Sequence, residues 1–141
     1  MLKKNNSLPQ EIIDALINLY NNGKITEILS RFDSLDNAYP NNHILYNLVG
    51  VITAKKGFKK EAKEFFQKAI ELEPKNPELC NNLAICLIEL NEYELAINIL
   101  QKATLLFPDS EESFYNLGNI YIIIQKYDKA VTSFKNCIKI N

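Results

Sequence analysis

The chain has no tryptophan, one histidine and a single arginine, Arg31, among its 141 residues. The other 15 basic residues are lysines, which bind phosphate as point charges and lack the paired donors of a guanidinium group. Sixteen basic residues against 17 acidic ones leave a net charge of -1. We therefore expect no nucleic acid among the partners of this chain, because binding to a phosphate backbone depends on many cationic contacts.

Cysteines and long hydrophobic runs are also scarce. Cys80, Cys86 and Cys137 show neither a CxxC spacing nor a histidine partner, so we expect buried thiols and no disulfide framework or metal site. No segment approaches the roughly 18 consecutive apolar residues of a membrane span. The first residues, MLKKNNSLPQ, carry charge with no apolar stretch behind it, unlike a secretory signal. We interpret these absences as favouring a cytoplasmic protein.

Catalytic signatures are missing from the sequence as well. We find no pairing of a nucleophile with a base, no glycine-rich phosphate loop and no metal-ligand cluster. We therefore expect neither catalytic residues nor a cofactor in this chain, and any catalysis would lie outside it.

What the sequence does contain is an internal repeat. Five columns of residues recur at an interval of 34. They are Pro40, Pro74 and Pro108; Gly50, Ala84 and Gly118; Ala62, Ala96 and Ala130; Phe66, Leu100 and Phe134; and Ala69, Ala103 and Cys137. The small members of these columns indicate places where helices approach closely and a larger side chain would overpack.

Within each period, apolar residues recur at steps of three and four, which is the spacing of one helix face. Each period holds two such stripes with a short polar turn between them, so we expect two antiparallel helices in every unit. The predicted fold class is an all-α solenoid of helix pairs. We expect an N-terminal extension at residues 1–8 and four repeats at about 9–42, 43–76, 77–110 and 111–141, the first of them degenerate.

These motifs resemble the tetratricopeptide repeat (TPR) family. The resemblance rests on NLVG…EAKEFFQKAIELEP, NLAI…ELAINILQKATLLFP and NLGNIY…DKAVTSFKNCIKI, and it extends from Pro9 to Asn141. In the first repeat, Ile28 and Leu35 replace alanines that are usual in the family, which leaves the packing of that repeat open. The resemblance implies a right-handed superhelix whose first helices line a concave groove for protein ligands.

The same resemblance implies which side chains look into that groove. They lie on the first helix of the second, third and fourth repeats, on the face opposite the core stripe. The candidates are Asn47, Val51, Glu78, Asn81, Asn82, Ile85, Glu89, Glu112, Tyr115, Asn116, Asn119 and Ile123.

Asparagine recurs among these candidates, and two interpretations of it stay open. Asn82 and Asn116 lie 34 residues apart and resemble the asparagine ladder of O-linked N-acetylglucosamine transferases, which would hydrogen-bond the main chain of an extended peptide. With 18 asparagines in the chain, composition alone also puts some on any exposed face. A clamp for acidic chaperone tails is rejected, because Glu78 and Glu112 stand where that clamp needs cations.

Two functions follow from the sequence. The first is an adaptor that binds a peptide or helix of another protein in the groove. The alternative is the N-terminal targeting or oligomerisation arm of a larger enzyme, since similar repeats precede glycosyltransferase, sulfotransferase or oxygenase domains.

The last predicted helix raises a separate expectation. Val131, Phe134 and Ile138 form an apolar stripe that no later helix of this sequence would cover. We expect either that the chain is a fragment of a longer array or that it self-associates through this stripe, most simply as a symmetric homodimer. Fraying or tilting of the last helix to hide the stripe is the alternative.

Overall fold

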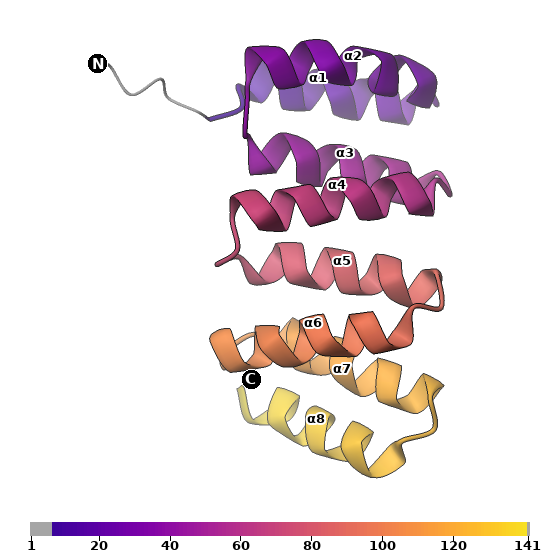
Figure 1. Cartoon of the computed structure of the whole chain (residues 1–141), viewed down its shortest axis with the longest axis vertical. Coiled ribbons are helices and arrows are strands. Elements are labelled where there is room, and N and C mark those ends of the chain that lie inside the picture. The colour runs from indigo at the N-terminus through magenta and orange to yellow at the C-terminus, as the bar shows by residue number, and fades with distance from the viewer. Residues whose placement is uncertain (1–6, 141) are drawn as a thin grey trace, which may run out of the picture. The chain divides into compact units, whose positions relative to one another are not determined.

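A computed structural model describes residues 7–140, which fold into eight α-helices and no β-strand (Figure 1). The helices are α1 (Gln10–Asn21), α2 (Ile25–Ala38), α3 (His43–Lys55), α4 (Lys59–Leu72), α5 (Pro77–Glu89), α6 (Tyr93–Leu106), α7 (Glu111–Ile123) and α8 (Tyr127–Ile140). None of them has the length and the apolar character that crossing a bilayer demands. They fall into two compact units that divide between Pro74 and Lys75.

Polar capping residues begin the first helices of the second, third and fourth hairpins. Asn42 accepts a hydrogen bond from the Leu45 amide at 3.0 Å, which satisfies a helix-end donor. Asn76 caps α5 in the same way and is followed by Pro77, whose lack of an N–H group costs nothing at that position. In α7 the capping residue is Ser110, which accepts from the Ser113 amide.

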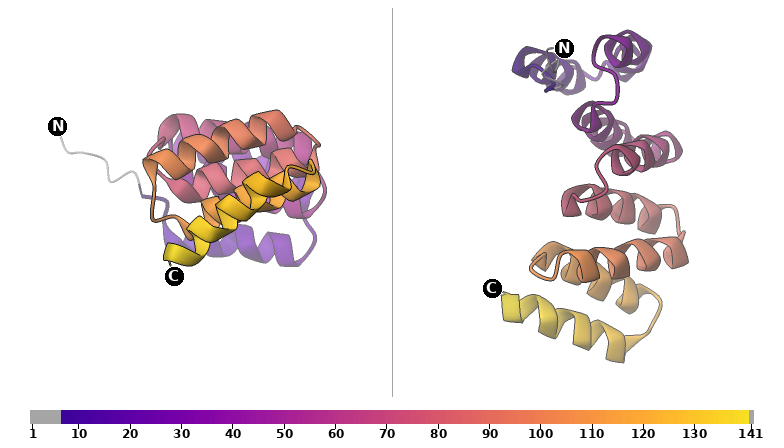
Figure 2. Two further views of the ribbon diagram at one scale, coloured as in Figure 1. Left: turned by 90° about the horizontal axis from the view of Figure 1, so that it is seen from below. Right: turned by 60° about the vertical axis from the view of Figure 1, so that its left-hand side comes forward.

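The turn inside each hairpin adopts a left-handed backbone conformation at one fixed position. The residues there have φ between 59° and 92° and recur every 34 positions, as Gly23, Gly57, Asn91 and Gln125. Glycine, and to a lesser degree asparagine, tolerates this conformation, so the tight reversal of the chain is encoded locally in three of the four hairpins. Figure 2 shows the resulting antiparallel course of α7 and α8.

Each unit has its own core. In the first unit, Leu16 of α1, Ile25 and Ile28 of α2, and Leu45 and Val49 of α3 are buried together. Leu8 joins this cluster, although it belongs to the predicted extension 1–8; residues 1–6 of that extension, like Asn141, lie outside the described residues.

The second unit is built on small residues. Ala84 in α5, Ala96 and Ala103 in α6, and Ala130 in α8 are buried at the positions that the sequence assigned to close helix contacts. A Cβ atom on Gly118 of α7 would lie 2.6 Å from Cε1 of Phe134, so glycine lets the ring of α8 pack directly on the α7 backbone.

Candidate functional site

The candidate surface in the second unit begins with a stripe along α5. Glu78, Ile85 and Glu89 are exposed and Asn82 is half-buried. Their spacing of four, three and four residues puts them on one face of the helix. An apolar centre between two carboxylates is therefore presented to solvent by α5.

A second stripe lies on α7. Glu112, Tyr115 and Ile123 are exposed and Asn119 is half-buried, again at helical spacing. Glu111 and Glu112 line a shallow depression of about 430 Å³ together with Tyr115. Glu111 is absent from the sequence-based candidates, although its place beside Glu112 in the first helical turn was the signal that could have found it.

Buried polar contacts hold the two helices side by side. The Ser113 hydroxyl donates to Oδ1 of Asn81 at 3.1 Å, and Nδ2 of Asn116 donates to the same oxygen at 3.5 Å. Since a buried amide without partners would be costly, these bonds are part of the packing of α7 on α5.

This packing removes two candidates from the accessible surface. Asn81 is 1% exposed and Asn116 is 8% exposed, in contrast to the groove position expected for both. Sequence spacing could not show this, because an asparagine on that side of the helix serves equally well as a ligand contact or as a contact between repeats. Asn82 and Asn119 are the amides of the second unit that keep partial exposure on the candidate face.

The candidates of the first unit lie on α3. Asn47 and Val51 are half-buried, beside the exposed Ile44 and Lys55. Unlike α5 and α7, this helix therefore combines apolar side chains with a cation in its last turn.

The residues expected to mediate self-association differ in their solvent exposure. Val131 and Ile138 are 51% and 73% exposed on the outer side of α8. Phe134 is half-buried, because its ring lies on Gly118 and 5.9 Å from the ring of Tyr115. The apolar stripe of α8 is therefore open at two of its three positions.

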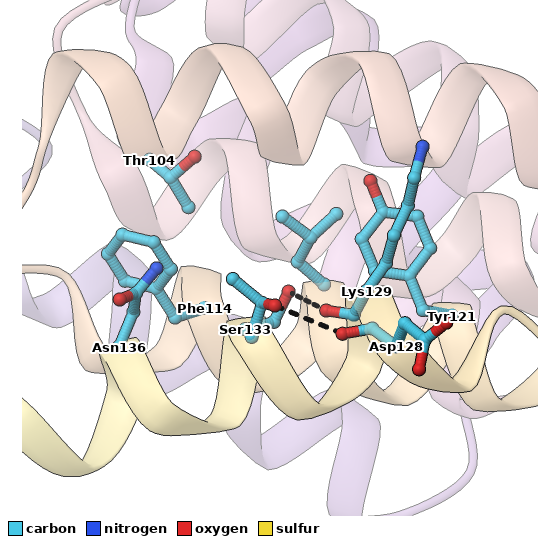
Figure 3. A pocket seen from close by; sticks show the side chains of 9 residues that line it. Thr104, Phe114, Tyr121, Asp128, Lys129, Ser133 and Asn136 are labelled. Carbon is cyan, nitrogen blue, oxygen red and sulfur yellow. Dashed lines mark hydrogen bonds between the residues drawn. The ribbon is translucent and has the colours of Figure 1, made fainter.

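A groove of about 370 Å³ is lined by α6 and by the last hairpin (Figure 3). Thr104 of α6 forms one wall, while Phe114, Tyr121 and Ser133 lie on the other side. The ammonium group of Lys129 lies 5.7 Å from the centre of the Tyr121 ring, so this cation rests on an aromatic face.

The described residues offer little for metal binding or nucleophilic chemistry. Within residues 7–140, no three His, Cys, Asp or Glu side chains come together as metal ligands. The three cysteines are buried thiols that form no disulfide, and burial raises the pKa of the Cys80 and Cys137 thiols. These two sulfurs stay protonated at neutral pH, which makes them poor nucleophiles.

One curated protein shows how the chain relates to larger proteins. It is 34% identical over 103 residues to the UDP-N-acetylglucosamine--peptide N-acetylglucosaminyltransferase of Giardia intestinalis, a match that covers 73% of this chain. The chain spans only 7% of the length of that relative.

Solved structures share the fold. A tetratricopeptide repeat protein from Parabacteroides merdae superimposes with a TM-score of 0.81 and 25% identity, over 94% of this chain and 53% of that one. The first TPR domain of Spaghetti (RPAP3), bound to the HSP90 peptide SRMEEVD, gives a TM-score of 0.67 and 20% identity, over 70% of this chain and 79% of that one.

Family models with the description tetratricopeptide repeat match residues 60–118 and 111–141, which together include the second helix of the second hairpin and all of the last two hairpins. The predicted fold class, an all-α solenoid of helix pairs, is thereby confirmed. The chain belongs to the tetratricopeptide repeat family, and it is a protein–protein interaction module.

Proposed function

We propose that the α5 and α7 stripes form the binding surface of this module and that it holds a peptide carrying aliphatic and basic side chains. The observation behind this proposal is the charge of the two helices. Glu78, Glu89, Glu111 and Glu112 are exposed on them, and neither helix contains Lys, Arg or His.

Three of these glutamates have a second explanation, since Glu78, Glu111 and Glu112 lie in first helical turns, where acids stabilise the helix dipole. Glu89 differs from them in position, because it ends α5, where a negative charge opposes the dipole. A carboxylate kept there beside the exposed Ile85 supports a role in contacting a cationic partner.

The exposed apolar side chains supply the rest of the surface. Ile85, Tyr115 and Ile123 stand between the carboxylates, and the partly exposed amides of Asn82 and Asn119 can hydrogen-bond a peptide main chain. A ladder through Asn116 is not supported, because that side chain is buried. The acidic peptide in the Spaghetti structure would meet like charge on this surface.

The test uses two synthetic peptides with the same leucine spacing, one with lysines and the other with glutamates at the remaining positions. Fluorescence anisotropy should show the lysine peptide binding about tenfold more tightly at low salt. Glu89→Lys with Glu112→Lys should remove that preference, and Ile85→Ser should weaken both peptides. The matched control is Glu94→Lys on the exposed side of α6. Equal affinity for the two peptides, or an equal effect of Glu94→Lys, would refute the proposal.

A second candidate is that the module is the targeting or oligomerisation arm of a larger enzyme. It is supported by the likeness to the Giardia transferase, of which the matching repeats are a small part. The reading frame decides between the two: continuation beyond Asn141 into a catalytic domain favours the arm, and a stop codon there favours a free adaptor.

We propose further that this chain binds without catalysing and resides in the cytoplasm. The buried, protonated thiols of Cys80 and Cys137 and the family's use as scaffolds support both statements. Cell fractionation with an antibody to the chain tests the location, and secretion or a disulfide in the isolated protein would contradict it.

A further inference from the structure

The junction between the third and fourth hairpins shows how a hairpin is covered by the one that follows it. In the second unit α7 packs on both α5 and α6. Asn81 of α5 and Leu100 of α6 are buried there, and Nε2 of Gln101 donates to the Tyr121 hydroxyl at 3.0 Å. This junction therefore has a covered side on α5 and α6 and a covering side on α7 and α8.

The surface equivalent to the covered side recurs 34 residues later on the last hairpin, where it is exposed to solvent. We call it the C-terminal face, and it consists of Tyr115, Val131, Phe134 and Ile138, which correspond to Asn81, Ile97, Leu100 and Thr104. Tyr115 is 52% exposed, whereas its counterpart Asn81 is buried by α7. The C-terminal face thus has the residues of a helix-docking surface and, among the described residues, no helix on it.

The covering side recurs 102 residues earlier on the first hairpin. We call it the N-terminal face, and it consists of Ile12, Ala15, Leu19, Arg31, Ser34 and Leu35, which correspond to Phe114, Leu117, Tyr121, Ser133, Asn136 and Cys137. Together with Leu16, these six side chains line a mainly apolar groove of about 240 Å³ between α1 and α2. In the fourth hairpin Leu117 and Tyr121 are buried. The corresponding residues of the first hairpin are more accessible, since Ala15 is exposed and Leu19 is half-buried.

Polar groups at the two faces are also complementary. Ser113 and Asn116, which donate to Asn81, are replaced on α1 by Glu11 and Asp14, which accept. The acceptor Asn81 is replaced on the C-terminal face by Tyr115, whose hydroxyl can donate. A copy of this contact between two molecules would therefore reverse the direction of the hydrogen bond, with the single hydroxyl proton of Tyr115 donated to one of the two carboxylates.

The formal charges match as well. On α8, Lys135 and Lys139 are exposed, whereas Lys129 lies on the Tyr121 ring in the groove toward α6. Helix α1 carries Glu11 and Asp14 and no base, and Arg31 of the N-terminal face is paired with Glu27. From the matched registers, polar groups and charges we infer that a second copy of this chain docks head to tail, with its N-terminal face on the C-terminal face of the first. A symmetric pairing of two α8 helices would instead bring like charges of Lys135 and Lys139 together.

A head-to-tail contact uses two different surfaces, so each can be blocked separately. Ala15→Lys places a cation in the N-terminal face and Ile138→Glu places an anion in the C-terminal face, and each opposes the charge of the facing surface. The matched control is Leu105→Glu, at an exposed position that holds Asn37, Glu71 and Lys139 in the other repeats. Circular dichroism should give the same helix content for all four proteins.

Sedimentation equilibrium is the measurement. We expect the mass of the wild type and of Leu105→Glu to rise with concentration to more than twice 16.2 kDa, and each blocked variant alone to stay at the monomer mass. An equimolar mixture of the two blocked variants retains one intact face of each kind and should form a dimer and nothing larger. Dimerisation of Ala15→Lys alone would show a symmetric contact through α8 and overturn the inference, as would a mixture or a wild type that stays monomeric.

Discussion

The first and last hairpins differ in where the phenylalanine of their second helix packs. In the last hairpin Gly118 leaves room for the ring of Phe134 to lie against the α7 backbone. In the first hairpin the corresponding residues are Leu16 and Phe32, and the leucine fills the space that the ring would need. Phe32 packs instead on Tyr46 and Phe65, with ring centroids 5.2 and 4.8 Å apart.

The consequence is a change in what the aromatic residue holds together. Phe134 closes its own hairpin, whereas Phe32 joins α2 to the hairpin of α3 and α4. The degenerate repeat is therefore a different packing arrangement built on the same helix pair, and Ile28 in its core takes the place of the alanines of the other repeats. Three substitutions test this difference.

The largest effect is expected at Ile28, which stands where the other repeats have Ala62, Ala96 and Ala130. If the first hairpin could pack like the others, Ile28→Ala would be tolerated. Ile28 is fully buried in the core of the first unit, so we expect a cavity and a loss of about 2–5 kcal/mol in the free energy of unfolding.

Urea unfolding followed by circular dichroism measures this loss. The control is Thr26→Ala, an exposed substitution on the same helix, which should stay within about 0.5 kcal/mol of the wild type. A stabilised Ile28→Ala protein would mean that the first hairpin relaxes to the regular packing.

The reverse substitution is expected to have the next largest effect. Ala96 is fully buried in α6, so Ala96→Leu inserts a large side chain where none fits and should cost about 1–3 kcal/mol through overpacking. Glu94→Gln, two residues away on the exposed side, should change little. Equal melting temperatures for the two variants would show that the small column is no packing constraint.

Much of the fold could be predicted from the sequence, because the 34-residue columns carry local information. The buried alanines and the left-handed turn at Gly57 follow from residue type alone. The new partners of Phe32 could not be predicted, since they depend on how three helices meet. For the same reason we expected Asn81 on the ligand face. Its burial depends on a contact with α7, where Ser113, 32 residues later in the chain, donates a hydrogen bond to it. The repeat boundaries and the remaining candidate residues stay predictions.

The smallest effect is expected at the polar contact of the first unit, which the other repeats lack. The Tyr46 hydroxyl hydrogen-bonds the carboxylate of Asp36, and the residues corresponding to Asp36 are Ile70, Thr104 and Ile138. Burial first, and then the hydrogen bond and the negative charge of Asp36, raise the pKa of Tyr46 from 10.0 to about 12. At neutral pH the variant Tyr46→Phe should lose about 1 kcal/mol of unfolding free energy.

The pH dependence gives this contact a specific signature. Because the pKa of Tyr46 is higher in the folded state, the folded protein binds more protons than the unfolded chain between pH 10 and about 12. The stabilising contribution is therefore complete below pH 10 and is lost as the pH rises through about 12. The two proteins share all their other titratable groups, so the difference between wild type and Tyr46→Phe isolates the tyrosine. We expect that difference in unfolding free energy to shrink steadily with rising pH. The ultraviolet absorbance of tyrosinate should show one late-titrating group in the wild type only. Parallel stability curves for the two proteins would place Tyr46 in contact with solvent and remove the polar link between α2 and α3.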